Sequence, residues 1–319
     1  MDKSKPLFSI RHMQRLRSFW GILLVVFVSS SCIDKEPDRP VALDTSTGNG
    51  AGTGSSAGTT GSYLLPEIDL SNWKVTLPIP RADGKPQEVM PPAILNYAAN
   101  TTLQQFMYND STDGSLVFYT YPGSTTTNTS YSRTELREQM VPGSNNVNWT
   151  FAQGGRMRGV LSVPEISVDQ SGDPHRTIIM QIHGRLTNQQ RDLIGASDNN
   201  APPVLKIYWQ DGMVRVKTKQ LKDLNDTYEE SLHTDAWEDD EGRTFAREVG
   251  TDSFTLEVIA ADGFLSVTMD DDETFVYDDV HMQRWGIFEN YFKAGNYLVT
   301  TDAGASARVK YYELEVSHD

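Results

Sequence analysis

One short stretch of the sequence carries ionisable side chains at every second position. In residues 131–140, YSRTELREQM, Arg133, Glu135 and Arg137 alternate with uncharged residues. Side chains in a β-strand point alternately to the two faces of a sheet, so this spacing predicts three ions in a row on one face. Such a row is either a solvated surface or the floor of a site for a charged ligand. A carboxylate is one such ligand, because it matches the donors of a guanidinium group.

Residues 176–183, RTIIMQIH, show alternation of the same kind. Ile178, Met180 and Ile182 are expected on one face, and Gln181 and His183 on the other. The apolar face suits the core of a β-sandwich, and the amide and imidazole remain available to a ligand. A single histidine on a strand is more often structural than catalytic, so this segment alone indicates no chemistry.

A third segment, YFKAGNYL (291–298), again separates an apolar face from a polar one. The apolar face would hold Phe292, Ala294 and Leu298, and the polar face Tyr291, Lys293, Gly295 and Tyr297. If the three segments are neighbours in one curved sheet, their polar faces line a single groove. The predicted lining is Arg133, Glu135, Arg137, Gln181, His183, Tyr291, Lys293 and Tyr297.

The elements that must position these residues are short strands. Further strands are expected at 115–121, 203–209, 213–219, 254–260, 264–270 and 309–317. The Asp-Gly pairs at 211–212 and 262–263 are strong hairpin signals, and long helical periodicity is scarce. We therefore predict an all-β fold, an antiparallel sandwich or jelly roll with a concave groove sheet. The polar stretch 184–203 is expected to be a loop with one helical turn, and the acidic stretch 221–250 a long loop. Such loops either cover the groove or extend into solvent.

The N-terminal residues predict export. Arg11, Arg15 and Arg17 precede a short apolar run at 19–28, and SSSC ends at Cys32, the single cysteine of the chain. This order is typical of a bacterial lipoprotein signal peptide, with Cys32 as the lipidated residue; the alternative is an anchor helix with an incidental cysteine. We expect a signal peptide at 1–31, a Gly/Ser/Thr-rich tether at 32–62 and a folded domain at 63–319.

Charge and composition restrict the partners. The formal net charge of −15 argues against nucleic acid but not against an anionic polymer, since binding depends on the local field of a cleft. The acidic runs DDDE (270–273) and WEDDEG (237–242) could hold calcium, but exposed turns are favoured. We expect a monomer with no cofactor and no metal.

Three motifs resemble those of a known family. RTELRE (133–138), QIH (181–183) and YFKAGNY (291–297) are similar in order and spacing to the signature motifs of polysaccharide lyase family 7, the alginate lyases. DLSNWKVTLP (69–78) resembles the start of the family's first strand, and the similarity spans about residues 66–317. Val299 departs from the pattern, because the family usually has glutamine there, and this puts one subsite contact in doubt.

The resemblance implies β-elimination on alginate, a polymer of mannuronate and guluronate, leaving 4,5-unsaturated uronate ends. It implies that Arg133, Gln181 and His183 neutralise the substrate carboxylate, because loss of the C5 proton adds charge there. It also implies that Tyr297 is the acid, and the base for mannuronate, while His183 is the base for guluronate.

The remaining predicted residues are assigned to binding. Arg137, Tyr291 and Lys293 are expected to contact neighbouring sugars, and Glu135 to orient Arg133 or Arg137 through a salt bridge. The nearby cations are expected to favour the phenolate form of Tyr297 by lowering its pKa.

Some alternatives remain open at this stage. The same sandwich could be a non-catalytic polyuronate-binding module, or a lyase for another polyuronate such as glucuronan. Ile182 in QIH tends to accompany activity on guluronate-containing polymer in the family. The expected location is the cell envelope, at the outer membrane, with the membrane face and the choice between internal and terminal cleavage left open.

Overall fold

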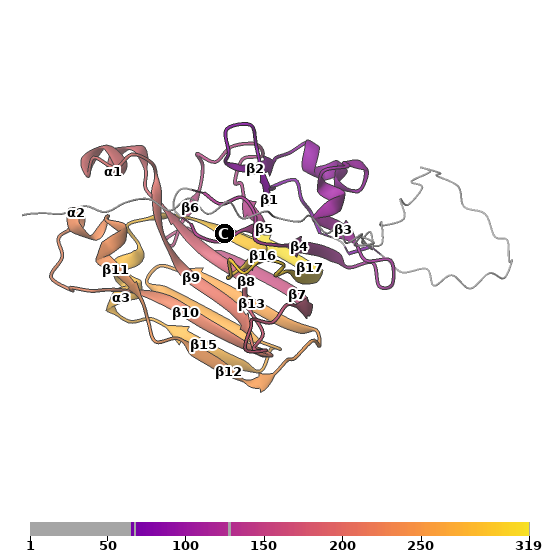
Figure 1. Ribbon diagram of the computed structural model, residues 1–319. Coiled ribbons are helices and arrows are strands. Elements are labelled where there is room, and N and C mark those ends of the chain that lie inside the picture. Colours follow the sequence, from indigo (N-terminus) through magenta and orange to yellow (C-terminus); the bar gives the residue numbers. More distant parts are fainter. Residues whose placement is uncertain (1–64, 67, 127–128, 319) are drawn as a thin grey trace, which may run out of the picture. The chain divides into compact units, whose positions relative to one another are not determined.

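The computed structural model describes residues 65–66, 68–126 and 129–318, where it forms two antiparallel β-sheets (Figure 1). The all-β prediction is confirmed. The predicted signal peptide, Cys32 and the predicted tether lie outside the described residues. No helix in the described part of the chain is long and apolar enough to cross a membrane.

The larger sheet contains the three segments with polar faces. Its order is β11 (Trp237–Asp239), β10 (Met213–Leu221), β9 (Asn200–Gln210), β8 (Arg176–Arg185), β16 (Glu289–Leu298), β5 (Arg133–Glu138), β1 (Trp73–Pro80) and β2 (Pro86–Val89). In addition, β12 (Arg243–Glu248) pairs with β10, and β6 (Trp149–Thr150) pairs with β16.

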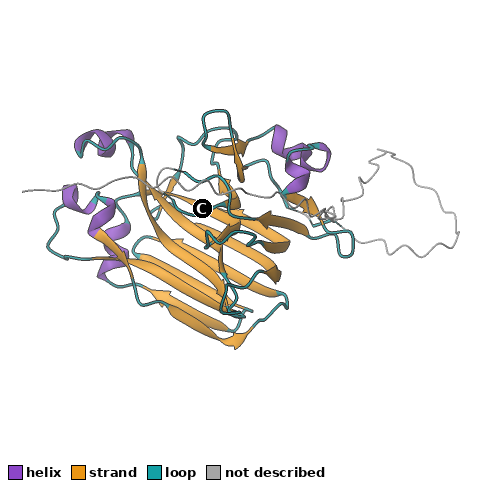
Figure 2. Ribbon diagram, in the orientation of Figure 1, coloured by secondary structure: helices purple, strands orange, loops and turns teal. Residues whose placement is uncertain are grey.

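The smaller sheet lies behind the larger one. Its order is β15 (Glu273–Tyr277), β14 (Phe264–Met269), β13 (Phe254–Ala261), β7 (Gly155–Ile166), β17 (Ala307–Ser317), β4 (Leu116–Thr120) and β3 (Met107–Asn109). Figure 2 shows short helices at the margins of the strands. They are α1 (Asn188–Leu193), α2 (Tyr228–Ser231), α3 (Val280–Trp285) and the 3-10 helices η1 (Ala93–Ala99), η2 (Leu103–Gln105) and η3 (Thr234–Ala236).

The core fills the space between the sheets with side chains from the inward-facing strand positions. Leu136, Met180 and Phe292 from the larger sheet are fully buried, as are Phe118 and Tyr311 from the smaller one. Burial of a large apolar side chain stabilises the folded state by about 1.5–3 kcal/mol. Because apolar residues alternate along three adjacent strands, their burial between the sheets leaves the opposite face of these strands for the groove.

The Asp-Gly hairpin prediction between β9 and β10 is confirmed. Gln210 pairs with Met213, and both turn residues have positive φ, 52° at Asp211 and 75° at Gly212. These values suit a two-residue turn that follows the right-handed twist of the strands.

The two long polar stretches have different outcomes. The first forms the single short helix α1, with a capping box between Thr187 and Gln190, between the ends of two strands. The second was wrongly predicted as loop throughout, because β11 and β12 lie within it and pair with β10. Trp237 in β11 and Phe245 in β12 explain why this stretch forms strands, because both side chains are buried. In the sequence they are isolated aromatic residues among polar ones, so they gave no clear strand pattern.

One predicted face is also wrong. Ile178 lines the groove, and the adjacent Ile179 occupies the core. Met180 and Ile178 are separated by one residue, whereas their β9 partners Ile207 and Tyr208 are adjacent, so β8 contains a bulge at this point. A bulge places an extra residue in one strand and breaks the simple alternation.

Candidate active site

The three segments with polar faces are neighbours in the larger sheet, in the order β8, β16, β5. Lys293 in the central strand is paired with Gln181 on one side and Arg137 on the other. Tyr297 is paired with Arg133, and Tyr291 with His183. The register therefore brings the predicted side chains onto one surface.

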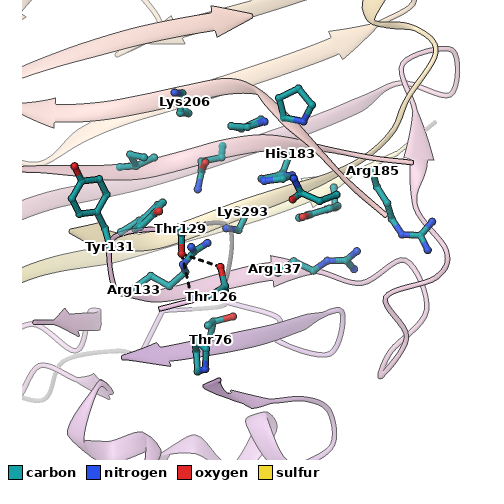
Figure 3. A pocket seen from close by; sticks show the side chains of 18 of the residues that line it. Thr76, Thr126, Thr129, Tyr131, Arg133, Arg137, His183, Arg185, Lys206 and Lys293 are labelled. Carbon is teal, nitrogen blue, oxygen red and sulfur yellow. Dashed lines mark hydrogen bonds between the residues drawn. The ribbon is translucent and has the colours of Figure 1, made fainter. Parts of the chain in front are cut away.

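These side chains line a groove of about 770 Å³ (Figure 3). Seven of the eight predicted residues form part of its lining, and only Glu135 does not. Among the described residues, the charged lining comprises nine cations and three anions. The cations are Lys74, Arg81, Lys85, Arg133, Arg137, Arg176, Arg185, Lys206 and Lys293, and the anions are Glu88, Asp198 and Asp239. A chain of net charge −15 thus concentrates positive charge where an anionic polymer could bind.

Glu135 lies beneath the groove, with its side chain only 1% exposed. Its carboxylate forms an ion pair with Lys293, lies 3.5 Å from Arg133 and accepts a hydrogen bond of 2.5 Å from the Gln181 amide. The predicted pairing with Arg133 is present. The closer cation is nevertheless Lys293. The residue paired with Glu135 is Gly295, and Lys293, which is paired with Arg137, reaches the carboxylate diagonally.

Arg137 is held by other groups. Its guanidinium donates to the Glu138 carbonyl at 2.6 Å and to Asn148 Oδ1 at 2.7 Å, and it lies 4.0 Å from the ring centre of Tyr291. A cation over an aromatic face is an attractive contact, so Arg137 and Tyr291 form one rigid wall of the groove.

Arg133 has hydrogen-bonding capacity that its protein neighbours leave unused. Its side chain is 12% exposed and lies 4.1 Å from the ring centre of Tyr297. Its Nη2 atom is buried and has no hydrogen-bond partner among the described residues. An unsatisfied buried donor is costly, and a bound carboxylate would supply its acceptor.

His183 is held as a neutral imidazole. Its Nδ1 donates to the Gly184 carbonyl at 2.9 Å, and its ring stacks on Tyr291 at 5.3 Å between ring centres. Burial, together with the charge of nearby Lys293, lowers the pKa of His183 to about 3. Because Nδ1 carries the proton, Nε2 presents a lone pair that can accept a proton from a ligand.

Tyr297 is protonated, contrary to the prediction of a lowered pKa. Burial raises the pKa of Tyr297 above its ordinary value; the Arg133 charge opposes this rise, and the Glu135 charge adds to it. The sequence prediction counted the cations but neither the burial of the phenol, which is the larger effect, nor the charge of Glu135. In the free protein, Tyr297 is therefore prepared to give a proton.

His183 and Tyr297 lie near opposite ends of the central strand. His183 is paired with Tyr291 near the start of β16, and Tyr297 lies near its end. The Lys293 amine is 6.0 Å from the ring centre of Tyr297. In Figure 3 the Lys293 side chain lies between His183 and Arg133, so one bound sugar ring over Lys293 would meet groups from all three strands.

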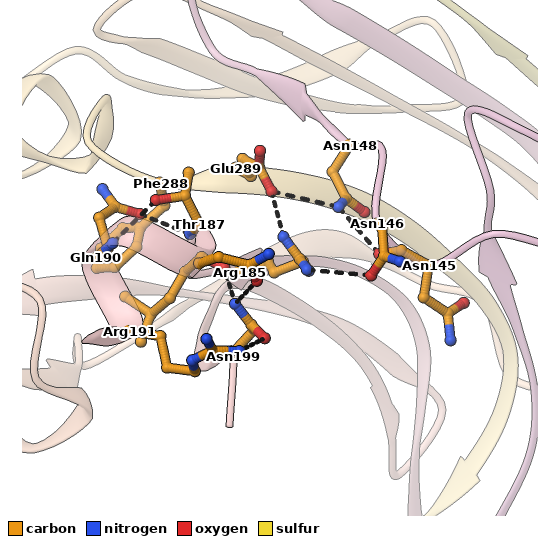
Figure 4. A network of polar contacts seen from close by, with 12 residues as sticks. Asn145, Asn146, Asn148, Arg185, Thr187, Gln190, Arg191, Asn199, Phe288 and Glu289 are labelled. Carbon is orange, nitrogen blue, oxygen red and sulfur yellow. Dashed lines mark hydrogen bonds and ion pairs between the residues drawn. The ribbon is translucent and has the colours of Figure 1, made fainter. Parts of the chain in front are cut away.

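The structure adds groove residues that the sequence analysis missed. Arg185 is two positions beyond His183 on the same face of β8, and continued alternation could have identified it. Its guanidinium contacts Glu289 at 2.6 Å and Asn146 Oδ1 at 3.4 Å (Figure 4). The same alternation could have identified Tyr131, two positions before Arg133. Three further additions lie on other strands, so the motifs gave no signal for them: Lys74, Lys206 and Tyr208.

The two acidic runs form ion pairs and hydrogen bonds with neighbouring protein groups. Asp239 contacts Lys219 at 2.8 Å, and Asp270 pairs with Arg247. Asp240 accepts a hydrogen bond of 2.9 Å from the backbone amide of Thr218. Among the described residues, no three His, Cys, Asp or Glu side chains are grouped so that they could hold a metal ion.

Comparison with known proteins identifies the family. A family model described as alginate lyase matches residues 68–318. The chain belongs to the alginate lyases. This family model covers nearly the whole described region, including all three motif strands. A comparison with curated proteins gives no match.

Solved structures place the chain more narrowly, in polysaccharide lyase family 7. Alginate lyase A1-II′, a member of that family, is 32% identical, with a TM-score of 0.60 over 79% of this chain and 96% of that one. A variant of it with one tyrosine replaced by phenylalanine, in complex with product (GGG), is 31% identical, with a TM-score of 0.61 over 80% and 100%. A variant with a histidine and a tyrosine replaced, in complex with substrate (GGMG), is 30% identical, with a TM-score of 0.60 over 79% and 95%.

Proposed function

We propose that this lyase cleaves the 1,4 linkages of guluronate-containing alginate by β-elimination in the groove of the larger sheet. The observation that carries the proposal is that His183, Tyr297 and Arg133 line one groove, where the buried Nη2 of Arg133 lacks a partner among the described residues. Burial lowers the pKa of His183 and raises that of Tyr297, which suits a base and an acid. The complexes of the related lyase with substrate (GGMG) and product (GGG) support an alginate oligosaccharide as the ligand.

Neutralisation of the substrate carboxylate comes first. Removal of the C5 proton adds negative charge to the adjacent carboxylate, and donors fixed in advance lower that barrier. The unpartnered Nη2 of Arg133 offers one such donor. The Gln181 amide, oriented by Glu135, has a second N–H available to offer another.

Proton transfer follows from the protonation states. On guluronate, Nε2 of His183 takes the C5 proton, the C4–O4 bond breaks, and a C4–C5 double bond forms. Tyr297 then gives its proton to O4 of the leaving sugar. On mannuronate, Tyr297 would have to serve as base as well, and its raised pKa disfavours that role. The neutral His183 and the Ile182 of the QIH motif support guluronate as the sugar that loses its proton.

The direct test is product formation by purified residues 63–319. Polyguluronate, polymannuronate and glucuronan would be compared as initial rates of near-ultraviolet absorbance from unsaturated ends. We expect the fastest rate on polyguluronate. Tight binding without any absorbance would show a binding module instead, and a fastest rate on glucuronan would reassign the substrate.

Lys293 gives the activity an alkaline limit. Burial lowers the pKa of Lys293 to about 8, so its ammonium group is lost as the pH rises through that value. Because kcat/KM reports the free enzyme, kcat/KM on alginate should fall above about pH 8. The Lys293→Arg variant keeps its charge and should lose this decline, whatever its overall rate. An identical alkaline limb in both proteins would remove Lys293 as its source.

We also propose that Cys32 is lipidated and anchors the lyase to the cell envelope, at the outer membrane. The arginine-rich start, the short apolar run and the small residues before Cys32 support this. Cys32→Ala should move the protein from membrane to soluble fractions of the producing cell. Retention of the variant in the membrane fraction would count against lipidation at this residue.

A further inference from the structure

A group of buried polar side chains lies directly behind Tyr297. Asn296, the preceding residue, points to the opposite face of β16 and is 0% exposed. Its Nδ2 donates to the Phe118 carbonyl at 2.9 Å and to the Ala307 carbonyl at 2.8 Å. Its Oδ1 accepts from the Thr177 hydroxyl at 2.8 Å. The amide of one side chain thus joins β16 to β4 and β17 of the smaller sheet and to β8 of the larger one.

The main chain beside Asn296 is irregular. Between Ala294 and Tyr297 the central strand advances three residues, while its partner advances two, from Met180 to Ile178. Gly295 has a φ of 136°, which other residues rarely adopt, and a Cβ there would lie 2.7 Å from the Thr134 carbonyl oxygen. Such a bulge turns the residues that follow it in a new direction.

Tyr311 of the smaller sheet satisfies the backbone groups at this bulge. Its buried hydroxyl accepts a hydrogen bond of 3.2 Å from the Gly295 amide and donates one of 2.6 Å to the Ile179 carbonyl. The bulges of β16 and β8 are therefore joined through one phenol from behind the sheet. Buried polar groups whose hydrogen bonds are all satisfied favour a single packing of the surrounding backbone and side chains.

We propose that Asn296 and Tyr311 are positioning residues that hold the bulge of β16 and so aim the Tyr297 hydroxyl at the leaving oxygen. This inference rests on the acid role proposed for Tyr297. Neither side chain lines the groove, so they act only through the backbone of Gly295 to Tyr297. Small misplacements of a reacting group cost large factors in rate, up to about 100-fold for about 1 Å.

The test is Tyr311→Phe, which removes one hydroxyl and keeps the ring. We expect kcat on alginate to fall about 10- to 100-fold, with KM within about twofold, because the groove lining is unchanged. The matched control is Tyr97→Phe on η1, which removes a tyrosine hydroxyl bonded to Asn109 at 2.6 Å outside the groove. The control should lower the melting temperature without lowering kcat.

A double variant separates positioning from general damage. If Tyr311 acts through Tyr297, adding Tyr311→Phe to Tyr297→Phe should lower the residual turnover no further. If Tyr311→Phe does not fold, Thr177→Val, which removes the hydroxyl bonded to Asn296, should show the same loss of kcat in milder form.

The outcomes distinguish this inference from the proposed function. A wild-type protein that forms no unsaturated ends contradicts the function itself. An active wild type and an inactive Tyr297→Phe, with full kcat in Tyr311→Phe or Thr177→Val, would overturn the positioning role alone. Additive losses in the double variant would overturn it as well.

Discussion

Tyr297→Phe should lose nearly all turnover on alginate while it still binds the polymer. The phenol is protonated in the free protein because burial and Glu135 raise its pKa, and it supplies the proton that the leaving oxygen needs. Loss of a general acid typically costs about 100- to 10,000-fold in rate. The aromatic ring would remain over Arg133, so the lining of the groove should persist. Turnover and binding can be measured separately, by near-ultraviolet absorbance and by calorimetry.

Tyr108→Phe is a suitable control for this variant. Tyr108, like Tyr297, contacts an arginine: its hydroxyl accepts from Arg308 at 3.2 Å, but it lies on β3 outside the groove. Its removal should leave turnover within about twofold of the wild type. Substantial activity in Tyr297→Phe would exclude Tyr297 as the acid.

Arg133→Lys should lower kcat by about 100-fold although the charge is kept. A donor aimed at developing charge is worth on the order of 3 kcal/mol of barrier, and lysine lacks the planar fork that meets a carboxylate with two hydrogen bonds. The buried Nη2 of Arg133 is the donor that would be lost. Initial rates at saturating alginate measure this effect.

The matched control for Arg133→Lys is Arg308→Lys on β17. Arg308 also lies over a tyrosine ring, that of Tyr119 at 5.1 Å, but it is outside the groove. This variant should keep its kcat. Equal, small effects of the two substitutions would show that Arg133 contributes charge alone. That result would contradict its role as a fixed hydrogen-bond donor to the substrate carboxylate.

Alternation in the sequence was enough to predict the groove face. Each motif strand has ions or hydrogen-bonding groups on one side and apolar groups on the other, and burial of the apolar side leaves little freedom in which face is exposed. Local pattern could not reveal the bulges in β8 and β16, because these depend on pairing with distant strands. For that reason Ile178 was assigned to the wrong face.

The predictions about charged groups also failed where they depended on contacts between distant strands. Both the closer partner of Glu135 and the pKa of Tyr297 depend on distances between strands that are more than 100 residues apart in sequence. The strand β7 was not predicted at all, although it is central in the smaller sheet. Its segment GRMRGVLSVPEI mixes charges, glycine and a proline, and pairing on both sides with β13 and β17 outweighs these weak local preferences.

The most direct test is the structure of the Tyr297→Phe variant with a bound tetrasaccharide of guluronate. One sugar should have its carboxylate against Arg133 and Gln181, its C5 hydrogen toward Nε2 of His183, and its O4 beside the substituted ring. A sugar chain bound elsewhere on the protein, or one whose C5 faces away from His183 and whose O4 lies out of reach of position 297, would contradict this account.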